Sequence, residues 1–566
     1  MASALLLALL AAARHTGPPA TGAVGPTEQV SVTLTTVDQR SLFEAQPSIP
    51  LGPAPSSPTI LVDAVAGTYQ KMVGFGAAIT DASAYVLHTA ENYEELMTLL
   101  FGSRAQGGIS LGMLRVPMGV SDFSMSYAAG NITYDDTPGD WDLQHFSTAV
   151  DDAHTIPVLR RARALNPSIK IVASPWTAPL WLKTGHQAPP LIGEGSLLDT
   201  DQAYETYANY FVRFVQEYKE KGVNVDYVTL QNEPNHGGCG TMPCMLLPEH
   251  QEAKLAVRVG QKLRIAGLDV RILAYDHNWG EQAGVPVSGP AYPTALLNDP
   301  AVNPWLAGVA WHCYGGSETA QTPVHELDPS KEVHMTECSG GGWSGPWSGN
   351  FVSNMRQLFV GGANNWGQSA LLWNMALDEH AGPRCRGGAC CTDCRGVLTV
   401  PSNATSMAEI TKNVEFYSLA HFSTFVPQGS VRVKSQPAPG SEATSKNSHC
   451  SAYCNASSAA CDWTKQYSCP WAQTPGTKGR ASDDGSVGYK CCCVDRTAAT
   501  QPCGGTTPGV GASVQFVAFV TPPPATETVL QVLNPTEEPQ KVAVVMGNGE
   551  RGFEYTLAPG LATFTW

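Results

Sequence analysis

The stretch VTLQNEPNH, residues 228–236, begins with apolar and β-branched residues and ends in an amide, a carboxylate and a proline. Its first part predicts a buried β-strand. Polar residues at the carboxyl end of such a strand are typical of parallel strands that open into a site. We therefore expect Asn232 and Glu233 to lie where a buried strand emerges, and the fold class depends on how many other strands end in the same way.

Eight such runs lie in the middle of the chain, at residues 72–80, 111–119, 169–176, 225–233, 270–277, 309–314, 332–337 and 370–377. Helical patterns separate them, most clearly at residues 82–101, 201–221 and 247–266. Alternating strands and helices predict parallel βα units, and eight such units close a (β/α)8 barrel. The sequence therefore predicts an α/β protein built on a TIM barrel.

Polar or aromatic residues stand at the ends of most of these strands. They are Thr80, Asp81, Arg115, Ser174, Trp176, Asp276, His277, His312, Tyr314, Glu337, Trp373 and Asn374. Any one of them alone fits an ordinary loop residue or a helix cap. Because the carboxyl ends of all barrel strands meet at one rim, the whole set predicts a functional site there.

Two glutamates, Glu233 and Glu337, end the fourth and seventh strands. Cleavage of a glycosidic bond with retention of configuration needs a proton donor and a carboxylate nucleophile about 5–5.5 Å apart. We assign Glu233 as the acid/base because Asn232, just before it, is placed to bond the hydroxyl beside the reacting carbon. Burial and the charge of Glu337 are expected to raise the pKa of Glu233.

Glu337 is assigned as the nucleophile because His312 and Tyr314 lie one strand away and are expected to donate hydrogen bonds to its carboxylate. Taken alone, a glutamate at a strand end is more often a partner in a salt bridge or a helix cap than a catalytic group. The pair of glutamates on one rim is what favours a hydrolase.

Tryptophans add a third indication, because the C–H faces of sugars stack on aromatic rings. Trp176, Trp311 and Trp373 lie in barrel strands, and Trp343 and Trp347 lie in the Gly-rich segment after the seventh strand. Trp311 also fits the core, since its side chain should point away from that of the following histidine.

Several motifs together resemble the glucosylceramidase group of glycoside hydrolase family 30. They are GFGAAITDASA, LRVPMGVSDFS, ASPWTAPLWLKT, TLQNEPNH, HMTECSGG, LLWNMAL and ITKNVEFYSLAHFSTFVPQGSVRV, and the resemblance covers most of residues 30–435 and resumes near residue 512. It implies a retaining β-glucosidase that hydrolyses glucosylceramide, with Glu233 as acid/base and Glu337 as nucleophile. The glucose pocket it implies is formed by Asp122, Trp176, Asn232, Tyr314 and Trp373, with His312 beside them, and it implies no metal or organic cofactor.

The resemblance also implies an accessory β-sandwich built from both ends of the chain. We expect its strands in residues 27–70, 426–445 and 510–566, where apolar residues alternate or cluster, around a catalytic barrel at residues 71–425. Residues 446–509 depart from the family pattern as an insertion with eight cysteines, for which we predict a small disulfide-stapled lobe. A zinc site is the competing interpretation of Cys491–Cys493 and of CCTDC at residues 390–394.

Other cysteines lie close to the expected site. Cys239 and Cys244 are near enough in sequence for a local bridge after the acid/base. Cys313 and Cys338 lie in barrel strands, and we expect both to be buried free thiols.

Composition narrows the partners and the compartment. Acidic residues outnumber basic ones by 49 to 34 in the 566-residue chain, so nucleic acid is not an expected partner. Residues 1–24 predict a secretory signal, and the 16 cysteines with sequons at Asn131, Asn403 and Asn455 suit an oxidising compartment, either lysosomal or vacuolar or extracellular.

Three functional hypotheses follow from these observations. The first is the glucosylceramidase, with a lipid-presenting activator and peripheral membrane contact as expected partners. The second is hydrolysis of another β-glycoside such as a steryl glucoside, a β-xyloside or a β-glucan, because loops that the sequence does not explain select the aglycone. The third is a sugar-binding protein without turnover, which the presence of both glutamates opposes.

Overall fold

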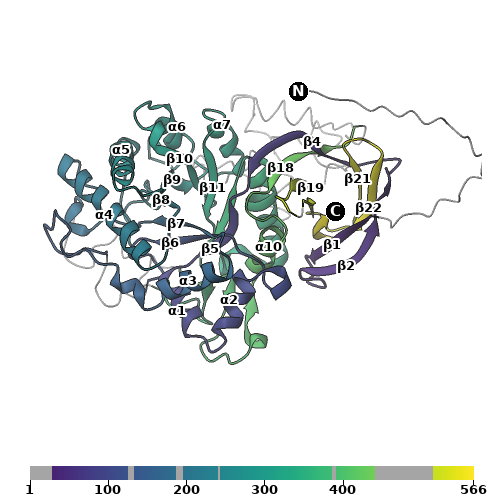
Figure 1. Cartoon of the computed structure of the whole chain (residues 1–566), viewed down its shortest axis with the longest axis horizontal. Coiled ribbons are helices and arrows are strands. Elements are labelled where there is room, and N and C mark those ends of the chain that lie inside the picture. Colours follow the sequence, from purple (N-terminus) through teal and green to yellow (C-terminus); the bar gives the residue numbers. More distant parts are fainter. Residues whose placement is uncertain are drawn as a thin grey trace, which may run out of the picture.

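The computed structural model describes residues 28–124, 133–185, 195–239, 242–384, 391–439, 514–524 and 526–566. The expected secretory signal, the Cys-rich insertion and the sequons at Asn131 and Asn455 lie outside these ranges. Asn403, the third sequon, is exposed in a turn. Figure 1 shows two bodies side by side, one with helices around a barrel and one built of strands.

The barrel is closed and has the eight predicted strands. They are β5 (Gly74–Ala78), β6 (Met113–Pro117), β7 (Lys170–Ser174), β8 (Tyr227–Thr229), β9 (Arg271–Asn278), β10 (Leu306–His312), β11 (Glu332–Glu337) and β13 (Ser369–Leu372). All neighbouring strands are parallel, and β13 returns to β5 to close the ring. Because the strands are buried on both faces, their sequences read as nearly continuous apolar runs.

Helices cover the barrel on the outside (Figure 1). They are α1 (Asp81–Thr89), α2 (Tyr93–Phe101), α3 (Thr155–Leu165), α4 (Asp201–Glu220), α5 (Glu249–Ile265), α6 (Ala291–Asn298), α7 (Gln321–His325), α8 (Trp347–Ser353), α9 (Gly362–Asn364) and α10 (Val414–Ser423). The pattern at residues 201–221 predicted α4 closely, and Thr200 caps its first turn. The stretch 82–101 was expected as one helix but forms two, because the chain turns between Ala90 and Asn92.

Both ends of the chain and a segment after the barrel form the second body, as predicted. Its ten-stranded sheet contains β1 (Gln29–Thr36), β2 (Glu44–Pro50), β3 (Gly52–Pro53), β4 (Ile60–Lys71), β18 (Val431–Pro437), β19 (Gln515–Val520), β20 (Thr528–Asn534), β21 (Gln540–Met546), β22 (Arg551–Leu557) and β23 (Gly560–Thr565). Apolar side chains from strands far apart in this sheet share one core, while others from β19, β20 and β23 join the core of the barrel.

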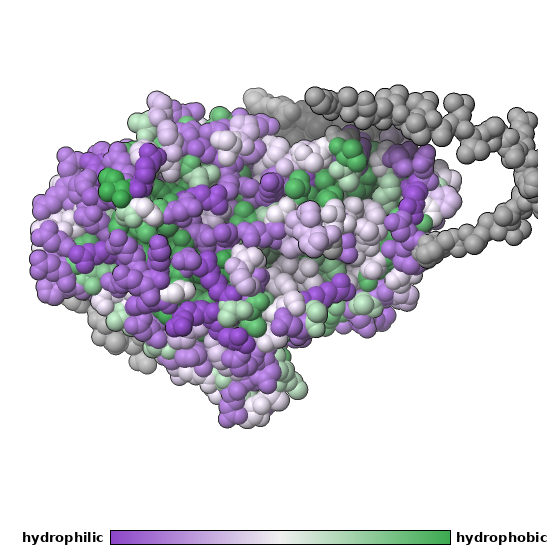
Figure 2. Space-filling view, in the orientation of Figure 1, coloured by the Kyte–Doolittle hydropathy of each residue, from purple (hydrophilic) through white to green (hydrophobic). Residues whose placement is uncertain are grey.

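Short strands fill the remaining loops near the rim of the barrel. β12 (Gly340–Gly341) pairs with β15 (Cys394–Arg395), and β14 (Ala376–Leu377), β16 (Leu398–Thr399) and β17 (Thr411–Lys412) form a small sheet. Within the described ranges, none of the helices combines the length and the apolar character that a membrane span requires. Figure 2 shows a mainly hydrophilic face with apolar side chains in several separate areas.

A buried histidine joins the two bodies. His421 of α10 is fully buried, and its ring nitrogens lie 2.8 Å from the hydroxyls of Thr35 in β1 and Thr563 in β23. Burial lowers the pKa of His421 to about 3. The folded protein therefore keeps this imidazole neutral at pH values where an exposed histidine is charged.

This histidine predicts a loss of stability in acid. Above pH 6.5 it is neutral in both states and contributes no pH dependence, whereas between pH 6.5 and about 3 only the unfolded chain binds the proton. Stability is therefore lost by about 1.4 kcal/mol per pH unit as the pH falls through this window. His421→Gln should flatten that slope by one proton in chemical denaturation at several pH values. Equal slopes in the two proteins would contradict the assignment.

Candidate active site

A cavity of about 660 Å³ opens at the carboxyl ends of the barrel strands. Most of the predicted site residues line it, namely Asp122, Trp176, Asn232, Glu233, Tyr314, Glu337 and Trp373. His312 lies directly behind them, fully buried. The structure thus brings these eight residues to one rim.

The two glutamates face each other across this cavity. One carboxylate oxygen of Glu233, one of Glu337 and a ring nitrogen of His312 lie within 4.8 Å of one another. Glu233 follows the short strand β8, and Glu337 is the last residue of β11. Carboxylates this close leave no room for an intervening water and suit direct attack on an anomeric carbon, the arrangement that retention of configuration needs.

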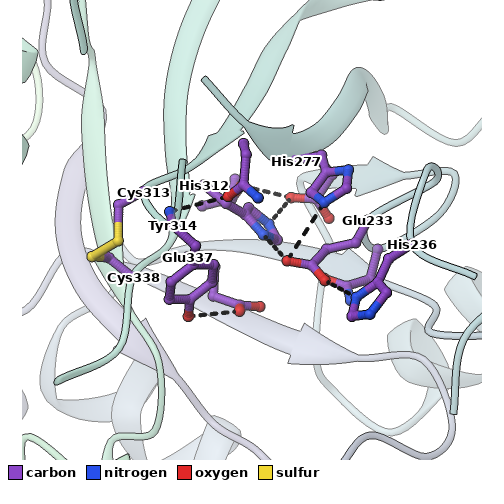
Figure 3. Close-up of polar contacts among 12 residues, drawn as sticks. Glu233, His236, His277, His312, Cys313, Tyr314, Glu337 and Cys338 are labelled. Atoms are coloured by element: carbon purple, nitrogen blue, oxygen red, sulfur yellow. Dashed lines mark hydrogen bonds and ion pairs between the residues drawn. A yellow bond between two sulfur atoms is a disulfide. The ribbon is translucent and has the colours of Figure 1, made fainter. Parts of the chain in front are cut away.

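Two hydrogen-bond donors hold the carboxylate of Glu337. The phenol of Tyr314 donates to Oε1 at 2.9 Å (Figure 3), and the guanidinium of Arg115 donates to Oε2 at 2.5 Å. The expected contact from Tyr314 is therefore present. The expected contact from His312 is not the one observed, because its two ring nitrogens lie 3.1 Å from Glu233 and 3.0 Å from Asp276 instead.

Asp276, in β9, organises the floor of the site. Its carboxylate accepts hydrogen bonds from Arg115 at 2.7 Å, Ser174 at 2.7 Å, Thr229 at 2.8 Å and Thr336 at 2.6 Å, besides the contact with the histidine behind Glu233. Burial alone would raise the pKa of Asp276, but the neighbouring cations hold it well below its usual range. A buried anion with this many donors fixes the strand ends relative to one another.

Arg115 links this anion to Glu337, so its loss leaves two buried carboxylates without their cation. We expect Arg115→Met to lower the free energy of unfolding by about 3–5 kcal/mol. Arg161→Met is a matched control because Arg161 pairs with the exposed Glu94 at the surface, where loss of a pair costs about 1 kcal/mol or less. Urea denaturation measures both, and similar small losses would show that the Arg115 pairs are not critical.

Three histidines surround the carboxylate of Glu233 (Figure 3). Nδ1 of His236 lies 2.8 Å from Oε2, Nδ1 of His312 lies 3.1 Å from Oε1, and Nε2 of His277 lies 3.9 Å from Oε1. Negative charge on Glu337 and Asp276 overcomes burial and raises the pKa of His312 to about 9, whereas burial lowers that of His277 to about 4.

The prediction of a raised pKa for Glu233 was wrong. Burial does oppose its ionisation, but His277 and the hydrogen bonds from His236 and His312 outweigh burial and hold the pKa of Glu233 well below its usual range. The raised pKa was expected from burial and the charge of Glu337 alone, without the three imidazoles. Glu233 is therefore an anion that accepts hydrogen bonds on both oxygens.

Backbone strain gathers at the same rim. Glu233, Tyr275, Asp276 and Asn374 all have positive φ, between 50° and 77°, which side-chain-bearing residues rarely adopt. The N–H of Glu233 donates to the carbonyl of Asp276 at 3.0 Å, which fixes one strained residue on another. Strain of this kind persists only where the surroundings impose it, and it is common at active sites.

The sugar-binding predictions have mixed outcomes. Trp176 and Trp373 stack on each other with ring centroids 5.1 Å apart and both line the cavity, while Trp343 is about half exposed at its mouth. Trp347 instead stacks on Phe351 in α8. Trp311 is fully buried in the core, as its alternative interpretation required.

Two polar residues complete the wall. Burial and the charge of Glu337 raise the pKa of Asp122 to about 8, so this side chain holds a proton at neutral pH. The Oδ1 atom of Asn232 accepts a hydrogen bond from Arg115 at 2.8 Å, which fixes the orientation of the amide. Both side chains can donate hydrogen bonds to sugar oxygens in these states.

Disulfides stiffen the rim. Cys239 and Cys244 form the predicted local bridge. Cys313 and Cys338 are bonded as well, which contradicts the expected free thiols: the parallel strands β10 and β11 bring their Cα atoms to 5.3 Å, a separation suited to a disulfide. Cys391 and Cys394 form a third disulfide. These two cysteines of CCTDC are therefore bonded to each other, which contradicts a zinc site formed by them.

The cluster of Glu233, His312 and Glu337 has atoms close enough for one cation. Its chemistry does not suit a metal, because His312 has a raised pKa and each of its ring nitrogens faces a carboxylate. An imidazolium that donates from both nitrogens has no lone pair left for coordination. The geometry fits an acid–base pair instead.

Comparison with known proteins gives the family. The model of the glycosyl hydrolase family 30 TIM-barrel domain matches residues 72–426. The chain belongs to glycoside hydrolase family 30. It is a glycoside hydrolase that acts on β-glycosides, and the matched range agrees with the barrel described above.

Relatives within family 30 differ in their substrates. An endo-1,6-β-D-glucanase of Aspergillus fumigatus is 32% identical over 386 residues, which cover 65% of this chain and 73% of the relative. The lysosomal acid glucosylceramidase of Mus musculus is 30% identical over 390 residues, which cover 64% and 70%. Among solved structures, the endo-β1,6-glucanase BT3312 is similar with a TM-score of 0.71 and 25% identity, covering 95% of this chain and 99% of that one.

Sequence reasoning missed two parts of this family 30 site. Arg115 and Asp276 were noticed as polar strand ends, but their ion pair at 2.7 Å depends on the barrel bringing β6 and β9 together across its interior. His236 was not singled out at all. Its position three residues after Glu233 was a usable signal, since a turn after a strand brings residues at that spacing together.

Proposed function

We propose that this chain is a retaining β-glucanase that cleaves β-1,6-linked glucose polymers, with Glu233 as acid/base and Glu337 as nucleophile. The pair of carboxylates within 4.8 Å across the cavity carries the proposal. Arg115 and Tyr314 donate hydrogen bonds to the two carboxylate oxygens of the nucleophile and so fix its orientation at the cavity.

The reaction proceeds in two steps. Glu337 attacks the anomeric carbon while a proton on Glu233 passes to the departing glycosidic oxygen. This step releases the leaving group and leaves a glucosyl group bonded to Glu337. Glu233 then removes a proton from a water that attacks the same carbon and frees Glu337. The stacked Trp176 and Trp373 offer the sugar an aromatic wall during both steps.

The relatives support a β-1,6-glucan substrate. The relatives from Aspergillus fumigatus and Neurospora crassa are each 32% identical to this chain, and both are named endo-1,6-β-D-glucanases. The cavity has an open mouth with Trp343 and Tyr314 partly exposed at its edge, as a polymer substrate requires. A glucan hydrolase was one of the alternatives for the sequence, and these observations favour it over the sphingolipid.

Glucosylceramide is the second candidate, favoured by the 30% identity to the mouse enzyme. A lipid-presenting activator and peripheral contact with a membrane belong to this candidate only. For either substrate we propose a destination in the secretory pathway, lysosomal, vacuolar or extracellular, supported by the three disulfides of the described residues.

A substrate panel tests the choice. The purified protein is assayed on β-1,6-glucan, β-1,3-glucan, xylan, steryl glucoside and detergent-dispersed glucosylceramide. We expect the highest kcat/KM on β-1,6-glucan, with oligosaccharides as early products. Turnover of glucosylceramide above that of every glucan would replace the first candidate by the second.

A further inference from the structure

His236 contacts an oxygen of Glu233 that the leaving group of the substrate has to reach. Both oxygens of Glu233 carry an imidazole partner, His236 on Oε2 and His312 on Oε1, and these partners approach from different sides (Figure 3). A carboxylic acid can protonate a glycosidic oxygen only through an oxygen that faces that atom. The side of each oxygen that faces its imidazole becomes available to the glycosidic oxygen only if that imidazole gives way.

The structure distinguishes the two partners. His312 is fully buried and anchored by Asp276 at 3.0 Å, so it stays in place. The side chain of His236 is 42% exposed and lines the cavity. Of these two partners, His236 is the one with room to leave.

We propose that His236 stores the proton that Glu233 delivers, and gives it up when the leaving group of the substrate displaces the imidazole from Oε2. This inference rests on the proposed role of Glu233 as acid/base. His236 acts through Glu233 and is a positioning and proton-supplying residue rather than a group that attacks the sugar.

The proton is conserved through the cycle. In the free protein Nδ1–H of the imidazolium donates to the anion of Glu233. As the ring leaves, that proton moves to Oε2, which gives a neutral imidazole and a neutral acid. The acid protonates the departing oxygen while the C–O bond breaks, and the proton that Glu233 later takes from water returns to the imidazole.

The charged groups around the imidazole of His236 agree with a proton held on this ring. Glu233 on the same turn and His277 interact with His236 electrostatically, and the other titratable groups of the site are His312 behind Glu233 and Glu281, Asp122 and Glu337 in the cavity wall. The hydrogen bond to Glu233 raises the pKa of His236, while that of Glu233 lies well below its usual range. The shared proton therefore stays with the pair until the pH rises through the raised pKa of the imidazole.

The test is a pH profile of kcat/KM for wild type and His236→Gln, with His250→Gln as a matched control at an exposed histidine. On a β-1,6-linked glucose oligosaccharide, His236→Gln should move the basic limb towards lower pH and reduce kcat/KM at pH 7 by about tenfold or more. On 2,4-dinitrophenyl β-glucoside, whose leaving group needs no proton, kcat/KM should change by less than about threefold. His236→Ala should regain activity with added imidazole.

An unmoved basic limb, an equal loss on both substrates, or no effect of imidazole would overturn the storage role and leave His236 a structural residue. These failures are distinct from failure of the proposed function. If Glu233 is not the acid/base, Glu233→Ala should lose similar activity on substrates with good and poor leaving groups. If only the role of His236 is wrong, Glu233→Ala should still lose far more activity on the substrate with the poor leaving group.

Discussion

Replacing Glu337 by glutamine is expected to lower kcat/KM on every β-glucoside by a factor on the order of 10⁴ or more, because the covalent route then lacks its nucleophile. Glutamine preserves the size of the side chain and its contact with Tyr314. Arg115 keeps its other buried partner, Asp276. The variant should therefore remain folded, and the loss should appear in kcat on natural and activated substrates alike.

Glu94→Gln is the control, since it removes a carboxylate from the surface, where Glu94 pairs with Arg161. Its kcat/KM should stay within about twofold of wild type, as surface pairs contribute little. Thermal unfolding of all three proteins shows whether the fold is intact. An active Glu337→Gln variant would remove the basis for a nucleophile at this position.

Glu233→Ala is expected to separate substrates by their leaving groups. On a β-1,6-glucan the loss of the proton donor should cost about 10²–10⁴-fold in kcat/KM. On 2,4-dinitrophenyl β-glucoside the first step needs no protonation, so kcat/KM should fall far less. Added azide should enter the space vacated by the carboxylate and raise turnover of the activated substrate, with β-glucosyl azide as product.

The product analysis decides this prediction. If azide speeds turnover and the product is the β-configured glucosyl azide, Glu233 is identified as the acid/base. Azide then attacks from the side of residue 233, and the β product requires a glucosyl group bonded to the enzyme on the opposite, α face. A similar loss on both substrates, with no azide product, would assign Glu233 a role in folding or binding instead.

The barrel and the position of Glu233 and Glu337 at its rim were predictable from the sequence, because both follow from local sequence patterns. The body of each strand is apolar, and its last residues change to polar ones where the chain leaves the core. Glu233 and Glu337 stand at that change. Which side chains meet across the barrel is a property of the closed ring, so the contact of Arg115 with Asp276 at 2.7 Å appears only in three dimensions.

The errors have the same origin. Cys313 and Cys338 look like isolated buried thiols along the chain, but β10 and β11 are neighbours in register, and the two cysteines stand one residue beyond the paired His312 and Glu337. The sign of the pKa shift of Glu233 depends on His236, His277 and His312, which three separate segments bring to one carboxylate. Counting only the negative charges near Glu233 gave the wrong direction.

The proposed mechanism depends most directly on the identity of the residue that bonds to the sugar. Incubating the protein with 2,4-dinitrophenyl 2-deoxy-2-fluoro-β-glucoside should trap the intermediate, because the fluorine slows both steps and the activated leaving group restores the first. Mass spectrometry of the digested protein should then find the fluoroglucosyl group on the peptide that contains Glu337, with fragmentation placing it on that carboxylate. A label on another residue, or rapid turnover of β-glucosides with no label under these conditions, would contradict the proposed mechanism.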